Sequence, residues 1–127
     1  MKDRKSYLVD IRCNTEADGQ LYVAESNGNP IPFDIKRVFW VCNVVPSARR
    51  GEHATKETKL ILVPVAGSCD VEVDDGSSKK VYHMDSATKG LYIDEMIYRT
   101  MFNFTPDCVM LALCDRPYTP GNETYED

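Results

Sequence analysis

Residues 60–84 read LILVPVAGSCDVEVDDGSSKKVYHM and contain three strand-like segments separated by two turns. The apolar run Leu60–Val65 is followed by a Gly-Ser turn and by the alternating segment Cys69–Val73. Asp74-Asp75-Gly76 is a hairpin turn signal, and Lys80–Met84 follows it. Alternation with a period of two is typical of strands with one buried face. Pro64 has no N–H to donate, so its segment is expected to be an edge strand or to contain a bulge.

The same pattern extends in both directions along the chain. Asp18-Gly19 indicates a hairpin near the N-terminus, and no segment keeps a helical period. Short strands at roughly even spacing predict an all-β sandwich or barrel. We expect one domain over residues 1–115 and a loosely ordered tail over residues 116–127, which is rich in proline and acidic residues. The further expected strands are at 7–13, 21–24, 35–45, 91–93, 97–104 and 108–114.

Composition excludes several classes of protein. The net charge of −5 disfavours a nucleic-acid binder, and no apolar stretch approaches the roughly 20 residues that a membrane span needs. The charged start of the chain does not read as a signal peptide. The five cysteines include no CxxC pair, which fits reduced thiols in a cytoplasmic protein better than disulfides or a zinc site.

Residues 49–56, Arg-Arg-Gly-Glu-His-Ala-Thr-Lys, contain the clearest candidate for chemistry. His53 is one of two histidines in the chain, and histidine is the side chain that most readily transfers protons near neutral pH. The neighbouring Arg50 has a geometry suited to phosphate. These residues suit an enzyme that acts on a phosphorylated small molecule. The alternative interpretation of the same eight residues is a surface loop that contains a histidine without a catalytic role.

An ordered series of short motifs resembles the cupin-type, WxcM-like sugar-nucleotide 3,4-ketoisomerases that act on dTDP-4-keto-6-deoxyglucose. The resemblance extends over roughly residues 7–115. It implies a cupin jelly-roll barrel, also called a double-stranded β-helix, without metal or other cofactor. It also implies a homodimer with exchanged N-terminal strands, and a role in making amino-deoxy sugars for surface polysaccharide or glycosylated metabolites. The motifs are Phe33–Val38, Arg50–Ala54, Gly67–Cys69, Asp74–Gly76, Asp85-Ser86, Lys89–Ile93 and Pro106–Val109.

The resemblance also assigns roles to individual residues. His53 matches the motif histidine that removes the proton on C3 of the sugar and delivers it to C4. Arg50 matches the motif arginine, which holds the pyrophosphate or orients the strand, and Arg37 is a weaker phosphate candidate. Arg99 occupies a position linked to the face of C4 that receives the proton, unless it is an exposed strand residue. Tyr92 is either core or part of the site lining.

Three positions depart from the family pattern. Thr55 replaces a second motif histidine, Phe39 replaces a tyrosine, and Leu60 replaces a glutamine. Three functional hypotheses therefore stay open. The first is an isomerase with an altered site, in which His53 alone catalyses slowly or Tyr98, His83 or a water replaces the missing proton relay. The second is a cupin that binds a nucleotide sugar without isomerising it, and the third is a generic cupin with an unrelated small ligand.

Spacing argues separately against a metal. Metal-binding cupins need a cluster such as His-x-His with a carboxylate and a later histidine. The residue two after His53 is Thr55, and His83 lies on a different expected strand.

Overall fold

A computed structural model describes residues 4–124, so the first three residues of the expected domain and the last three of the expected tail lie outside the described residues. Within the described part, the chain is built from strands and contains no helix. The prediction of an all-β protein is therefore confirmed. The strands are β1 (Ser6–Asp10), β2 (Arg12–Glu16), β3 (Gly19–Val23), β4 (Arg37–Cys42), β5 (Arg50–Thr55), β6 (Leu60–Ala66), β7 (Cys69–Asp74), β8 (Lys79–Met84), β9 (Lys89–Ile93), β10 (Tyr98–Phe102), β11 (Val109–Cys114) and β12 (Glu123–Thr124).

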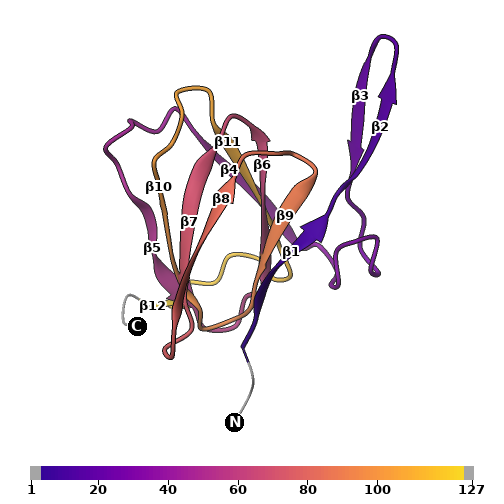
Figure 1. Ribbon diagram of the computed structural model, residues 1–127. Coiled ribbons are helices and arrows are strands. Elements are labelled where there is room, and N and C mark those ends of the chain that lie inside the picture. Colours follow the sequence, from indigo (N-terminus) through magenta and orange to yellow (C-terminus); the bar gives the residue numbers. More distant parts are fainter. Residues whose placement is uncertain (1–3, 125–127) are drawn as a thin grey trace.

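Ten of these strands form two antiparallel five-stranded sheets that face each other (Figure 1). The first sheet has the order β1-β9-β6-β11-β4, and the second has the order β12-β5-β10-β7-β8. Alternate side chains of both sheets point inward and form the main core. Buried members include Leu62, Leu91 and Met110 from the first sheet and Val71 and Met84 from the second.

The outer face of the first sheet is covered as well. Ile61 and Val63 of β6 point away from the main core and pack against Ile11 and Ile31 of the N-terminal segment. Strand β6 is consequently buried on both faces, which explains why its sequence is continuously apolar rather than alternating.

Strand β6 lies inside the first sheet, between β9 and β11, and Pro64 is accommodated by a bulge. Ala66 pairs with Val109 and Pro64 pairs with Met110, so Val65 is the extra residue on β6. Of the two expectations for this proline, the structure selects the bulge.

The expected N-terminal strand at 7–13 is divided into β1 and β2. Ile11 between them is buried, and its backbone N–H donates to the Thr88 carbonyl at 2.8 Å. After this point β2 and β3 pair with each other and project from the body of the molecule (Figure 1). The expected hairpin at Asp18-Gly19 is confirmed.

The C-terminal segment returns to the second sheet. Glu123 pairs with Thr55 and Thr124 pairs with Ala54, which adds β12 beside β5. Asn122 ties the preceding loop to the turn after β5: its side chain accepts from the Glu57 N–H at 2.9 Å and donates to Thr58 Oγ1 at 2.6 Å. Loose order of residues 116–127 stays a prediction. No helix able to cross a membrane occurs among residues 4–124.

Candidate active site

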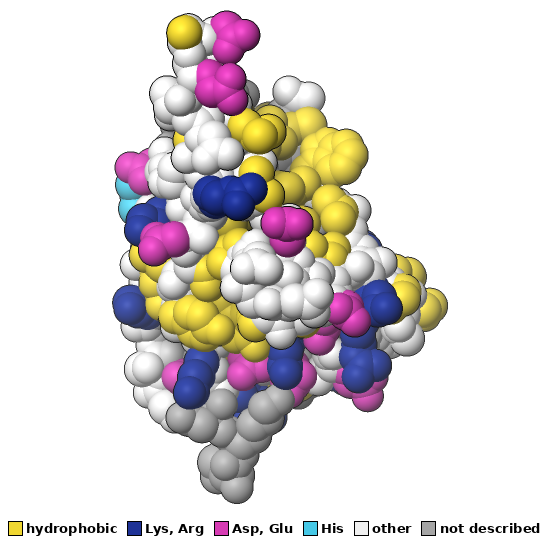
Figure 2. All heavy atoms as spheres, turned by 90° about the vertical axis from the view of Figure 1, so that its right-hand side faces the viewer, with side chains coloured by type: hydrophobic (Ala, Val, Ile, Leu, Met, Phe, Trp, Pro, Cys, Tyr) yellow, Lys and Arg dark blue, Asp and Glu magenta, His cyan; other side chains and the backbone are white. Residues whose placement is uncertain are grey.

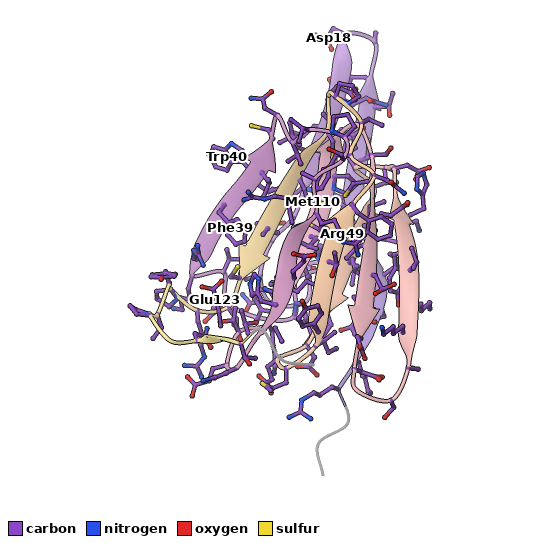
Figure 3. The ribbon with its side chains drawn as sticks, turned by 90° about the vertical axis from the view of Figure 1, so that its left-hand side faces the viewer. Asp18, Phe39, Trp40, Arg49, Met110 and Glu123 are labelled. Carbon is purple, nitrogen blue, oxygen red and sulfur yellow. The ribbon has the colours of Figure 1, made fainter. Side chains whose placement is uncertain are left out.

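A cavity of about 320 Å³ opens between the two sheets and the C-terminal segment. This volume is at the lower end of the range for small-molecule sites. Strands β4, β6 and β11 supply one wall, β5 and β10 supply the other, and Tyr118 and Glu123 of the C-terminal segment close one side. Figure 3 views the molecule from the left-hand side of Figure 1 and labels Phe39, Met110 and Glu123, which line this cavity.

A bulge in β5 places His53 in this cavity. Arg99 of β10 pairs with His53 while Thr100 pairs with Gly51, so Glu52 is the extra residue. Gly51 and Glu52 have φ of 82° and 53°, in the left-handed region. A side chain at position 51 would also meet the Arg99 carbonyl oxygen at 3.1 Å, so glycine fits both the backbone angle and the space. Bulges beside functional sites commonly redirect one side chain.

The imidazole of His53 is oriented by its own strand. Nδ1 lies 2.8 Å from the Gly51 carbonyl oxygen, which can only accept, so Nδ1 carries a proton. In the neutral ring the lone pair is therefore on Nε2. Nε2 lies 3.4 Å from a guanidinium nitrogen of Arg99 and 3.1 Å from Oε2 of Glu123. Nδ1 is thus held by its own strand, and Nε2 faces the cavity between Arg99 and Glu123, where it can act as a general base when it carries no proton.

Arg99 lies behind His53 and is buried, with only 6% of its surface exposed. Burial lowers its pKa to about 10, so it remains charged at neutral pH. It donates to Thr55 Oγ1 at 3.2 Å, and Thr55 in turn donates to the Thr58 carbonyl at 2.9 Å. This chain of hydrogen bonds holds a buried positive charge next to Nε2 of His53.

Two further arginines lie at the cavity. The guanidinium of Arg37 lies 4.6 Å from the centre of the Phe39 ring and 5.3 Å from that of Tyr118, both within the range of cation–π attraction. Arg50 is exposed and lines the same cavity. Three arginines and one carboxylate give the lining a net positive charge that suits an anionic ligand.

The structure brings together most of the residues singled out from the sequence. His53, Arg50, Arg37 and Arg99 all line the cavity, and Arg99 is not the exposed strand residue that was the alternative. Tyr92 does not join them: it is 7% exposed, belongs to the cluster on the outer face of the first sheet, and its ring stacks on that of Tyr7 at 4.6 Å.

The three positions that depart from the family pattern also meet in this cavity. Thr55, Phe39 and Leu60 all line it. Two of the suggested replacements for the proton relay lie elsewhere: Tyr98 is outside the lining, and His83 is on β8, where Nδ1 lies 2.6 Å from Oδ1 of Asp70.

Sequence reasoning missed Glu123, Tyr118 and Asn122. The tail has no apolar period, so only the fold reveals that it returns to β5.

No group of three His, Cys, Asp or Glu side chains within residues 4–124 is arranged to hold a metal ion. Metal-independent chemistry stays a prediction.

Comparison with known proteins identifies the family. The family model described as "FdtA: WxcM-like, C-terminal" matches residues 4–127. The chain belongs to this family. The resemblance inferred from the motifs is therefore confirmed.

The chain is also similar to individual relatives and to solved structures. A TDP-4-oxo-6-deoxy-α-D-glucose-3,4-oxoisomerase of Aneurinibacillus thermoaerophilus is 38% identical over 111 residues, which cover 87% of this chain and 79% of that protein. The crystal structure of WlaRA, a TDP-fucose-3,4-ketoisomerase of Campylobacter jejuni, has a TM-score of 0.89 and 32% identity, covering 95% of this chain and 89% of that one.

A mutant of the 3,4-ketoisomerase QdtA from Thermoanaerobacterium thermosaccharolyticum, crystallised with TDP-4-keto-6-deoxyglucose, has a TM-score of 0.91 and 28% identity, covering 95% of this chain and 87% of that one. These similarities confirm the cupin jelly-roll expected for the FdtA family.

Proposed function

We propose that this protein is a sugar-nucleotide 3,4-ketoisomerase that converts a TDP-linked 4-keto-6-deoxyhexose into its 3-keto isomer. Relatives at 38% and 32% identity are named for this type of reaction. The observation that carries the proposal is the placement of His53, whose Nδ1 is held by Gly51 so that Nε2 lies in the cavity beside a buried arginine.

The geometry suits proton transfer between neighbouring carbons. Nε2 of His53 removes the proton on C3, and the electron pair moves onto the C4 carbonyl to form an enediolate. The protonated His53, whose proton exchanges with solvent, then protonates C4 as the carbonyl forms at C3. Negative charge develops on O4 during the step, and the fixed guanidinium of Arg99 stabilises it without having to reorganise.

The cavity mouth supplies the contacts for the nucleotide part of the substrate. Arg50 and Arg37 provide positive charge for the pyrophosphate, and the guanidinium of Arg37 contacts the rings of Phe39 and Tyr118. Tyr92 has no contact with this cavity and is assigned to packing.

The activity is tested by incubating the protein with TDP-4-keto-6-deoxyglucose and following the sugar by NMR. Wild type is expected to form a 3-keto sugar, and His53→Asn is expected to lose turnover by about 10²–10⁴-fold. His83→Asn is the matched control, because it makes the same change outside the cavity. A wild type that binds TDP without making product would instead identify a cupin that no longer isomerises.

Assembly as a homodimer through the N-terminal strands is part of the proposal. Leu21 and Tyr22 on the projecting hairpin and Leu8 on β1 are exposed, and hydrophobic side chains gather on this face of the molecule (Figure 2). A second copy that covers them would remove apolar surface from water. Light scattering after gel filtration should give twice the mass of the chain, and a monomer would contradict the proposal.

The proposed setting is the cytoplasm, where the free thiols would stay reduced. A 3-keto sugar is a substrate for amine transfer, so the product would feed the synthesis of amino-deoxy sugars.

A further inference from the structure

The geometry points to Glu123 of β12 as a second catalytic residue, which carries the proton between the O3 hydroxyl and O4 of the sugar. This inference rests on the proposed ketoisomerase function and adds a residue to it. The reaction must move a proton between two carbons and also between two oxygens, and one histidine cannot do both in the same step.

The residues that would share this work in the family pattern are changed here. Thr55 does not titrate near neutral pH, and its hydroxyl is already engaged with Thr58 and Arg99. Phe39 has no proton to give. Glu123 is the only carboxylate among the described residues that line the cavity. Two other side chains in the lining, Cys114 and Tyr118, have a proton that they could give, but they are less suited. Cys114 is 1% exposed, and burial raises the pKa of its thiol. Tyr118 is 60% exposed and therefore lies mostly in solvent.

The position of Glu123 is compatible with this role. Its Oε2 lies 3.1 Å from Nε2 of His53. When C3 of the sugar lies next to Nε2, the O3 hydroxyl on that carbon is therefore within reach of the carboxylate. The side chain of Glu123 is 39% exposed, against 17% for His53, so the carboxylate is the more accessible of the two groups. Pairing of β12 with β5 and the Asn122 hydrogen bonds hold it there.

The proton balance closes without any other reactant. His53 takes the C3 proton and the enediolate forms, with negative charge on O4. In the second half of the reaction, Glu123 accepts the proton of the O3 hydroxyl, and the C3 carbonyl forms. At the same time C4, the other carbon of the double bond, takes a proton from His53. Glu123 then delivers its proton to O4. Both side chains end in their starting states, and the sugar has exchanged one carbonyl position for the other.

This scheme predicts that Glu123→Gln separates the two proton transfers. In deuterated water, removal and return of the C3 proton needs His53 alone, so the variant should still exchange deuterium into C3 of the 4-keto substrate. Formation of the 3-keto sugar should fall by about 10²–10⁴-fold, the usual range for loss of a general acid–base group. Glu123→Asp keeps the carboxylate and should recover part of the product formation.

Glu52→Gln is the matched control, because it makes the same change on β5 at a residue that lies outside the cavity lining and pairs with Arg49 at 3.4 Å. Product formation at the wild-type rate in Glu123→Gln would overturn the inference. An equal loss of exchange and product would also overturn it, because Glu123 would then act through the position of His53. Absence of both in wild type would instead overturn the ketoisomerase function itself.

Discussion

Asn122 is predicted to hold the C-terminal segment against the cavity, and Asn122→Ala tests this directly. The substitution removes two side-chain hydrogen bonds, one from the Glu57 N–H and one to Thr58 Oγ1. The bond from the Lys56 N–H to the Asn122 carbonyl, at 2.7 Å, remains. The segment should therefore be weakened rather than released.

The size of the effect follows from the surroundings of the two lost partners. A protein hydrogen bond contributes about 0.5–1.5 kcal/mol net, and a buried group left without its partner costs more than an exposed one. Glu57 is exposed, so water can replace the bond to its N–H, whereas Thr58 is only 6% exposed. We expect a total loss of about 2 kcal/mol, which corresponds to a roughly 30-fold shift toward the undocked segment.

Amide hydrogen exchange at Lys56 measures this docking, because its N–H donates to the segment. Exchange at Lys56 should accelerate by about 30-fold in Asn122→Ala if local opening controls it. Affinity for TDP should fall in the same variant, since the segment carries Tyr118 and Glu123 into the cavity lining. Asn14→Ala on the β2–β3 hairpin is the control. Unchanged exchange and unchanged affinity would show that Asn122 does not secure the segment.

Three further predictions concern Arg50 at the cavity mouth, His83 on the protein surface and Leu91 in the core. Arg50→Ala should raise KM for the nucleotide sugar by about 10-fold with little effect on kcat; a fall in kcat alone would contradict uniform phosphate binding. The hydrogen bond to Asp70 raises the pKa of His83 above its ordinary 6.5, so an NMR titration should give a midpoint above that value. The stability that this pair adds should be complete below pH 6.5, as long as Asp70 is ionised, and should be lost as pH rises through the raised pKa of His83. Equal melting temperatures of wild type and His83→Gln at all pH values would exclude it. Leu91→Ala, at a fully buried position, should reduce the free energy of unfolding by about 2–5 kcal/mol, whereas Val81→Ala on the exposed side of β8 should cost far less.

Part of the fold could be predicted from the sequence because several strands, β4, β5, β7 and β8 among them, alternate between more and less buried residues. The alternation in Cys69–Val73 and the hairpin signal at Asp74–Gly76 correspond to β7 and to the turn before β8. Burial on both faces hides this pattern in β6, where length and composition alone indicated a strand. The division of the N-terminal strand at Ile11 was not visible, because Ile11 continues the apolar alternation and its hydrogen-bond partner Thr88 is distant in sequence.

The candidate site was only partly predictable. His53 and Arg50 are neighbours in sequence, so their motif could be read without a structure. Arg99 reaches His53 through the pairing of β10 with β5, and Glu123 reaches it through β12. Neither strand pairing leaves a pattern in the sequence around Arg99 or Glu123 that would predict it. Tyr92 shows the converse, because it belongs to a matched motif but its side chain lies on the outer face of its sheet.

The decisive experiment is incubation of wild type with TDP-4-keto-6-deoxyglucose in deuterated water, with NMR detection of deuterium in the sugar. If His53 acts as the carbon base, a 3-keto sugar should accumulate with deuterium at C4. A protein that binds the substrate, seen as a higher melting temperature, yet leaves C3 and C4 without deuterium and forms no 3-keto sugar would contradict the proposed isomerase.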